Sequence, residues 1–292
     1  MKIAYKKCIL RAAQLQVVAL ANEILEEYEK QGYVLTLRQL YYQFVARDLL
    51  PNTLQSYKRL GGIINEGRLG GLVDWKLLED RTRGLEKLAA WDSPADIVYS
   101  CVQQYRRNLW DNQPYYVEVW VEKEALAGVV EQACNEYQVP HLSCRGYTSQ
   151  SEMWCAGRRL IEQTDTDHKI LILHLGDHDP SGIDMSRDIQ DRLEMFVGNP
   201  PEFKRIALNM NQVRKYKPPP NPAKTTDARF VSYRREFGVE SWELDALEPK
   251  VITKLIQSEI ESIIDYDIWE EDLAHEAKEK KVLEKIVKDL RK

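Results

Sequence analysis

Hydrophobic positions recur every three or four residues in the first part of the chain, as they do in short amphipathic helices. The pattern predicts one helix over residues 8–30, after which Gly32 acts as a stop signal. Thr36 is an N-cap residue before a second helix, LRQLYYQFVARDLL, and Thr53 begins a third, TLQSYKRLGGIINEG. These helices, followed by the mixed segment LVDWKLLEDRTRG, predict a helical, winged-helix-like domain over residues 1–90.

Farther along the chain, the pattern changes to apolar strands that alternate with amphipathic helices. Strands are predicted at YYVEVWV, HLSCR, KILILHL and FKRIALN, with helices between them at about 125–137, 151–163 and 183–196. Such alternation favours a parallel sheet with crossover helices on its faces. We therefore expect an α/β fold, with a parallel-sheet domain over 112–265 and a charged C-terminal helix over 266–292.

The composition excludes several classes of protein. The chain has 292 residues, of which 43% are apolar and 30% charged, as is ordinary for a globular protein of two domains. No stretch approaches the roughly 18 apolar residues that cross a bilayer, and the N-terminus lacks a secretory pattern. We therefore expect a cytoplasmic protein with no membrane partner. The five scattered cysteines form no C-x-x-C pair, which argues against a disulfide framework or a zinc site.

The net charge of −5 is distributed unevenly along the chain. Residues 203–235 contain nine Lys/Arg and one acid, whereas residues 240–292 contain fifteen acids and nine Lys/Arg. A compact basic segment inside an acidic protein is typical of a local phosphate-binding surface. The alternative is a solvated loop.

Carboxylates follow two of the predicted strands. Glu122 ends the first strand, and Asp177 and Asp179 come directly after the third in GDHDPSG. Parallel sheets bind ligands at the carboxyl ends of their strands, and alternate residues of an extended segment face the same side. The three acids therefore predict an Mg²⁺ site, with His178 pointing away from it. The ordinary alternative is that Asp179 caps a helix, Asp177 is solvated and Glu122 forms an ion pair.

These motifs resemble a known family. VEKEA, followed about 55 residues later by GDHDPSGIDM, resembles the Toprim domain of topoisomerases, primases and some nucleases. The D-x-D-P-x-G form and CRGYTSQSEMW resemble the A subunit of topoisomerase VI and its relatives that make meiotic DNA breaks. TLRQLYYQF resembles the winged-helix segment that contains that family's nucleophilic tyrosine. The likeness covers about residues 30–200, and the sequence beyond Arg205 looks more like short prokaryotic or mobile-element relatives.

Two adjacent tyrosines compete for the role of nucleophile. At helical spacing, Tyr41 shares an apolar stripe with Leu37 and Leu40, which places it in the core. Tyr42 falls off that stripe, near Arg38, which lies four residues earlier on the same side. The family resemblance also points to Tyr42. A tyrosine on a helix is structural in most proteins, so the assignment depends on the three acids being present as well.

The resemblance implies a specific reaction. Tyr42 would attack a DNA phosphorus and form a 5′-phosphotyrosyl link, with Arg38 orienting the phosphate and Mg²⁺ offsetting its charge. It also implies a homodimer on double-stranded DNA, in which the tyrosine and the metal site of one centre come from different subunits. The candidate DNA contacts are Lys58, Arg59, Arg205, Arg214, Lys215, Lys217, Lys224 and Arg229.

Nucleotide chemistry is not expected in this chain. It has no G-x-x-x-x-G-K-[ST] phosphate loop, so an ATP-driven clamp would come from a separate ATPase subunit. Two other functions stay open. One is a metal-dependent DNA nuclease that uses water as the nucleophile, with Tyr42 merely structural. The other is a non-catalytic DNA-binding module that keeps the acids for folding.

Overall fold

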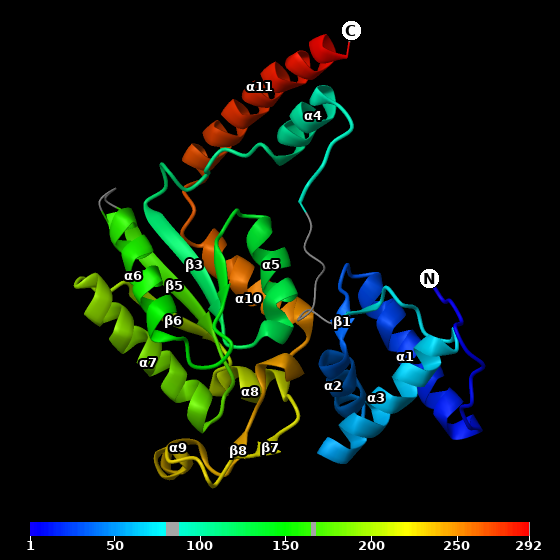
Figure 1. Cartoon of the computed structure of the whole chain (residues 1–292). Coiled ribbons are helices and arrows are strands. Elements are labelled where there is room, and N and C mark those ends of the chain that lie inside the picture. Colours follow the sequence, from blue (N-terminus) through cyan, green and yellow to red (C-terminus); the bar gives the residue numbers. More distant parts are fainter. Residues whose placement is uncertain (80–87, 165–167, 292) are drawn as a thin grey trace.

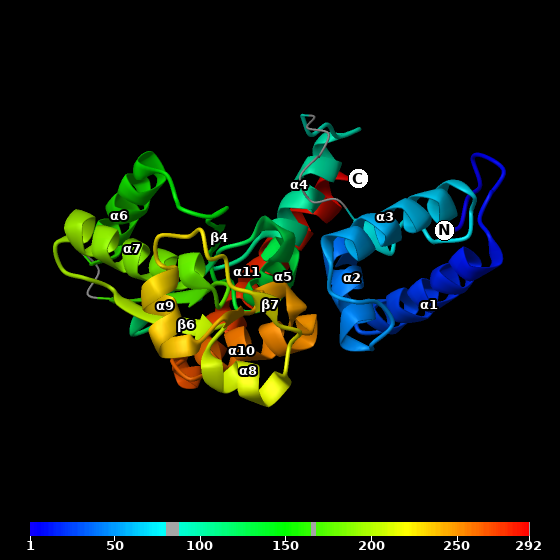
Figure 2. The same cartoon turned by 90° about the horizontal axis from the view of Figure 1, so that it is seen from below.

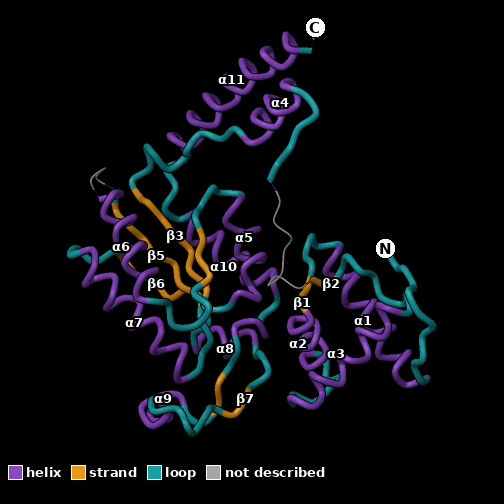
Figure 3. The backbone as a smooth tube through the Cα atoms, viewed as in Figure 1, coloured by secondary structure: helices purple, strands orange, loops and turns teal. Residues whose placement is uncertain are grey.

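The computed structural model describes residues 1–79, 88–164 and 168–291. Figure 1 shows an α/β architecture, in which a group of N-terminal helices lies beside a parallel sheet with helices on both faces. Figure 3 shows the strands of that sheet gathered in one place, whereas the N-terminal group is almost entirely helical. The expected α/β class with a parallel sheet and a helical C-terminus is confirmed.

The N-terminal group begins its helices where the sequence places their caps. Its elements are α1 (Ala12–Glu29), β1 (Leu35–Thr36), α2 (Leu37–Ala46), α3 (Leu54–Leu69) and β2 (Leu78–Glu79). The Thr36 side chain accepts a hydrogen bond from the Gln39 amide, and Thr53 accepts one from the Ser56 amide. Helix α2 ends earlier than predicted, and Asp48 follows it in the left-handed region with φ 54°.

Few strand residues lie in this first group. Strands β1 and β2 have two residues each and pair in parallel. The expected mixed segment LVDWKLLEDRTRG runs into residues 80–87, which lie outside the described part of the chain. Figure 2 shows α1, α2 and α3 grouped to one side of the sheet and its helices.

The parallel sheet has the strand order β4-β3-β5-β6. Its strands are β3 (Tyr115–Val121), β4 (His141–Ser143), β5 (Lys169–Leu175) and β6 (Glu202–Ala207), close to the four apolar segments predicted from the sequence. The covering helices are η1 (Glu124–Leu126), α5 (Ala127–Asn135), α6 (Gln150–Thr164), α7 (Pro180–Val197) and α10 (Pro249–Glu261), of which the last lies within residues 240–292, where the sequence pattern is helical.

Alternation along the strands separates the two faces of the sheet. Val117, Val119 and Val121 join the core with α5 and α10, whereas Trp120 lies in a second apolar cluster with α6 and α7. Because strands buried on both faces have no polar side to show, β3 and β5 are nearly continuous apolar runs. Packing on both faces therefore fixes the positions of the carboxyl ends of these strands.

The basic segment after β6 contains more helix than its sequence suggests. It includes α8 (Met210–Tyr216) and α9 (Phe230–Phe237), with the two-residue strand β7 (Asn221–Pro222) within the proline-rich stretch. Strand β7 pairs antiparallel with β8 (Glu240–Ser241), and the turn η2 (Leu244–Ala246) follows. The chain thus returns from the basic segment to the carboxyl ends of the sheet strands.

Two helices project from the sheet in Figure 1. These are α4 (Pro94–Gln104) and α11 (Tyr266–Leu290), and their contact includes a 2.6 Å hydrogen bond from the Tyr105 hydroxyl to Glu279. Helix α4 therefore packs on a distant part of the chain. Among the described residues, no helix has the length and apolar character needed to cross a membrane.

Candidate active site

The three predicted acids lie at the carboxyl ends of adjacent strands. Glu122 follows β3 and accepts a 2.8 Å hydrogen bond at Oε2 from the amide of Asp177, which follows β5. Both side chains are buried. Asp179 caps α7, because its Oδ1 accepts from the Gly182 amide at 2.6 Å and from the Ser181 hydroxyl at 2.9 Å. The capping role that the sequence offers as an alternative for Asp179 is therefore real.

Two glycines let residues 176–182, which we call the acidic loop, approach Glu122 closely. A Cβ atom on Gly182 would lie 2.3 Å from the Asp177 carbonyl oxygen and 3.1 Å from Glu122 Oε2. A Cβ atom on Gly176 would lie 3.0 Å from the same Glu122 oxygen. Real Cβ atoms essentially never approach another atom as closely as 2.3 Å, so Gly182 is required by the turn of the loop itself, and both glycines relieve a tight approach to Glu122.

Burial and mutual repulsion disturb the acids electrostatically. Burial raises the pKa of Glu122, and the nearby charge of Asp179 adds to that shift. Burial raises the pKa of Asp177 to about 7, even though the Lys123 ammonium opposes the shift. Carboxylates that are costly to ionise in the free protein are suited to binding a cation, which would stabilise their charged forms.

A half-buried arginine holds the backbone of the acidic loop. The Arg205 guanidinium donates to the carbonyl oxygens of Gly176 at 2.8 Å and Asp177 at 2.6 Å, and also to Gly182, Leu208 and Ser186. Burial lowers its pKa to about 10. The sequence predicts a DNA contact for Arg205, but in the structure its guanidinium donates these hydrogen bonds to the acidic loop and to its neighbours Ser186 and Leu208.

His178 points away from the acids, as the sequence predicts. Its Nδ1 lies 2.8 Å from the Tyr233 hydroxyl, and its ring packs against Phe237 and Trp242. Burial lowers the pKa of His178 to about 4, so it is neutral at physiological pH. Backbone hydrogen bonds in both directions between His178 and Trp242 tie the acidic loop to the chain that follows β8.

Three further charged residues at the site were not predicted. The Lys123 ammonium forms ion pairs with Asp177 at 2.8 Å, Glu243 at 2.8 Å and Asp245 at 3.1 Å. Although burial alone would lower the pKa of Lys123, the charges of Asp245 and Asp177 raise it. The only sequence signals were the position of Lys123 beside Glu122 and the acidic pair in WELDAL, more than a hundred residues away.

The charged cluster formed by Arg38, Lys123, Asp177, Glu243 and Asp245 extends to helix α2. Arg38 pairs with Glu243 and, at 3.0 Å, with Asp245. It also lies over the ring of Tyr42, 5.8 Å from the ring centre. Tyr42 and the acidic loop are therefore connected through one network within a single chain.

Tyr42, which the sequence places off the apolar stripe of α2, is buried in the structure. Tyr42 is 3% exposed, almost the same as Tyr41 at 4%, because η2 packs against α2 on the side that the helix alone would leave open. Burial raises the pKa of the Tyr42 phenol. The predicted proximity of Tyr42 to Arg38 is confirmed.

The two tyrosines differ in what their hydroxyls touch. Tyr41 accepts a 2.8 Å hydrogen bond from the Thr53 amide and lies near the carbonyl oxygens of Pro51 and Thr53. No hydrogen bond joins the Tyr42 hydroxyl to the described residues. Both tyrosines line a cavity of about 180 Å³ together with Arg38, Asn221 and Glu243. The Tyr41 hydroxyl is thus held by backbone groups, whereas the Tyr42 hydroxyl is not hydrogen-bonded to the described residues.

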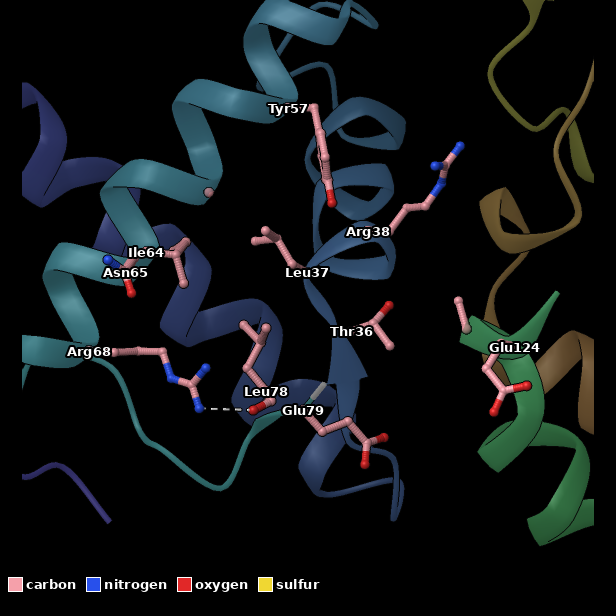
Figure 4. Close-up of a pocket in the computed structure, with 12 residues that line it drawn as sticks. Thr36, Leu37, Arg38, Tyr57, Ile64, Asn65, Arg68, Leu78, Glu79 and Glu124 are labelled. Atoms are coloured by element: carbon pink, nitrogen blue, oxygen red, sulfur yellow. Dashed lines mark hydrogen bonds between the residues drawn. The ribbon is translucent and has the colours of Figure 1, made fainter. Parts of the chain in front are cut away.

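A second cavity, of about 480 Å³, also has Arg38 among its lining residues (Figure 4). It is bordered by α2, α3, β2 and the start of η1. Figure 4 shows Arg38 projecting from α2, while Arg68 on α3 donates to the Leu78 carbonyl oxygen at 3.0 Å. Arg38 thus lines both cavities, of which only the smaller is also lined by Tyr42.

The acids fit a magnesium ion in part. Across residues 1–79, 88–164 and 168–291, no three acidic, histidine or cysteine side chains are arranged to hold one ion together. The second oxygens of Glu122 and Asp179 make no hydrogen bond or ion pair with described residues, whereas Asp177 is paired with Lys123. Mg²⁺ commonly takes one or two carboxylates and completes its shell with water and substrate phosphate. Glu122 and Asp179 could supply these one or two carboxylates.

The remaining predicted DNA contacts differ in availability. Lys58 and Arg59 on α3 are exposed and have no ion-pair partner among the described residues. The same holds for four residues of the basic segment, Arg214, Lys215, Lys217 and Lys224. Arg229 instead pairs with Asp184 at 2.6 Å and Asp227 at 3.2 Å, and lies over Tyr147.

Comparisons with known proteins add no relative. No protein-family model matches the chain, and a search of curated proteins finds no match either.

Proposed function

We propose that this protein cleaves DNA by tyrosine transesterification, in the manner of the A subunit of a type IIB topoisomerase. The sequence resemblance supplies the reaction, with a winged-helix domain for Tyr42 and a Toprim domain for the acids. The observation that carries the proposal is the charged cluster: Arg38 beside Tyr42 and Lys123 beside Asp177 share the carboxylates of Glu243 and Asp245. A phosphate entering there would meet the tyrosine and the acids of the same chain, whereas the family resemblance implies a centre shared between two subunits.

In the proposed reaction, the Tyr42 oxygen attacks phosphorus and the bond from phosphorus to the 3′ oxygen breaks. The products are a 5′-phosphotyrosyl link and a free 3′-hydroxyl, which takes up a proton equal to the one that the phenol loses. Arg38 orients the phosphate. Glu122 and Asp179, with Asp177 once it parts from Lys123, would hold Mg²⁺, which offsets negative charge on the phosphate when bound.

The proposal includes partners. Double-stranded DNA is the substrate, and cutting both strands requires two tyrosines and hence a homodimer. Lys58 and Arg59 on α3, together with the exposed lysine and arginine side chains within residues 214–224, would supply sequence-independent phosphate contacts. We propose that the chain cuts with Mg²⁺ and without ATP, and that coupled strand passage requires a separate ATPase subunit.

A second candidate is a metal-dependent DNA nuclease that uses water. The burial of Tyr42, at 3% exposure, favours it, because hydrolysis does not require the phenol to reach the substrate. This reaction leaves no covalent link between protein and DNA, so the two candidates give different products.

The deciding experiment incubates the protein with 3′-end-labelled duplex DNA and Mg²⁺, without ATP, and then denatures it, because a 5′-phosphotyrosyl link keeps the fragment that carries the 3′ end. Transesterification predicts label attached to the wild-type chain and to Tyr41→Phe, and none attached to Tyr42→Phe. Cleaved DNA without attached label would favour the nuclease. An adduct formed by Tyr42→Phe would exclude Tyr42 as the nucleophile.

A further inference from the structure

Two cations from different parts of the fold meet at one carboxylate oxygen. Arg38 on α2 and Lys123, which follows Glu122, both contact Oε2 of Glu243, with the lysine at 2.8 Å. In sequence, Glu243 lies 205 residues from Arg38 and 120 residues from Lys123. Contacts over such separations exist only because the segment after β8 returns to the strand ends.

A neighbouring acid, Asp245, forms ion pairs with both cations. Asp245 pairs with Lys123 at 3.1 Å and with Arg38 at 3.0 Å, and its side chain is fully buried. The Glu243 side chain keeps 24% of its surface exposed. Asp245 thus has the position of a permanent internal partner, whereas Glu243 covers the solvent side of the same two cations.

The cluster also contains more anions than cations. Three carboxylates, from Asp177, Glu243 and Asp245, face the Arg38 guanidinium and the Lys123 ammonium. If Glu243 swings out, the two cations keep Asp245 and Asp177 as partners. Its departure therefore leaves no buried charge unpaired, which is the condition under which such a contact opens readily.

The place that Glu243 would leave borders the cavity beside Tyr42. Glu243, Arg38 and Tyr42 all line that cavity of about 180 Å³. Guanidinium and ammonium groups that converge on one oxygen form a site suited to a phosphate oxygen as well as to a carboxylate. A phosphodiester group seated there would lie next to the tyrosine ring.

We infer that Arg38 and Lys123 form a phosphodiester-binding site, and that Glu243 occupies it in the free protein as an internal competitor. DNA phosphate enters by displacing the Glu243 carboxylate, which opens the cavity wall next to Tyr42. This rests on the proposed function for the identity of the phosphate, and it adds Lys123 as a phosphate ligand and Glu243 as an autoinhibitory residue.

The test uses Glu243→Gln and the matched variant Glu248→Gln. Glu248 is exposed, lies five positions further along, and its replacement removes the same charge without touching Arg38 or Lys123. Binding of a short fluorescein-labelled duplex is measured in EDTA, so that cleavage does not interfere. Glu243→Gln should bind at least about fivefold more tightly than Glu248→Gln, with a salt dependence steeper by about one phosphate contact.

Inorganic phosphate gives a second readout that requires no DNA. It should raise the melting temperature of Glu243→Gln more than that of the wild type, and the double variant Arg38→Gln/Glu243→Gln should lose this response. If Glu243→Gln does not fold, Glu243→Asp replaces it, because the shorter side chain retracts the carboxylate while keeping the charge.

The outcomes separate the inference from the proposed function. Equal behaviour of Glu243→Gln and Glu248→Gln in both assays would overturn the inference, even if Tyr42 forms the covalent adduct. A phosphate response that survives loss of Arg38 would also overturn it. A phosphate response specific to Glu243→Gln, in a protein that makes no adduct, would support the inference while removing the proposed reaction.

Discussion

The acidic loop and the tyrosine helix α2 are held in different ways. The acidic loop is fixed by backbone groups: Arg205 binds its carbonyl oxygens, the Asp177 amide binds Glu122, and Trp242 pairs with His178. Helix α2 meets the same centre through the ion pairs of the Arg38 side chain and through its packing against η2. A loop held through its backbone keeps its shape whatever its side chains bind, whereas the side-chain ion pairs of Arg38 can be exchanged for a competing anion.

The largest expected effect is on catalysis at the acidic loop. Asp179→Asn or Glu122→Gln should lower Mg²⁺-dependent DNA cleavage by about a thousandfold or more, because the metal would lose an oxygen ligand. Duplex binding should be spared or strengthened, since removing a carboxylate also removes repulsion of phosphate. Asp191→Asn, on the exposed side of α7, is the control. Undiminished cleavage by Asp179→Asn and Glu122→Gln would show that these acids do not form the metal site.

The next effect concerns the support beneath the loop. Arg205→Met should lower the free energy of unfolding by about 4 kcal/mol, because it leaves buried carbonyl oxygens without a donor. Arg214→Met, at an exposed position with no partner among the described residues, should change it by less than about 0.5 kcal/mol. Chemical denaturation of both variants measures the difference. Equal losses would show that the loop does not depend on Arg205.

Acid should lower the free energy of unfolding through a buried histidine, His174 on β5, the strand that precedes the acidic loop. Burial, aided by the charge of Arg205, lowers the pKa of His174 from 6.5 to about 3. The unfolded chain therefore takes up a proton between pH 6.5 and 4 that the folded protein does not, so stability is lost as the pH falls. Over that range, the wild type should lose about 3 kcal/mol more than His174→Gln. Parallel stability curves would contradict this.

The smallest effect is on the tyrosine side. Tyr41→Phe removes the acceptor of the Thr53 amide and should cost about 1 kcal/mol of stability, with adduct formation retained. Tyr57→Phe is the matched control, since it packs against the Tyr41 ring but makes no hydrogen bond through its hydroxyl among the described residues. If Tyr41→Phe is as stable as the wild type but forms no adduct, Tyr41 and not Tyr42 is the nucleophile.

Local signals in the sequence determined much of the fold. Thr36 and Thr53 were recognisable as caps because an N-cap acts on amides only a few residues away. The apolar runs gave a parallel sheet, and the strand-end rule placed Glu122 and Asp177 together. The direction of the His178 side chain, away from the acids, followed from the alternation of an extended segment.

Only the tertiary structure decided which of these side chains are accessible and what they contact. Periodicity showed the face of α2 that Tyr41 shares with the core, but not that η2 would cover Tyr42 as well. Lys123 and Glu243 stand 120 residues apart, and no local rule pairs charges over such a distance. Hydrophobic patterns and caps are short-range, whereas ion pairs and burial depend on which segments the folded chain brings together.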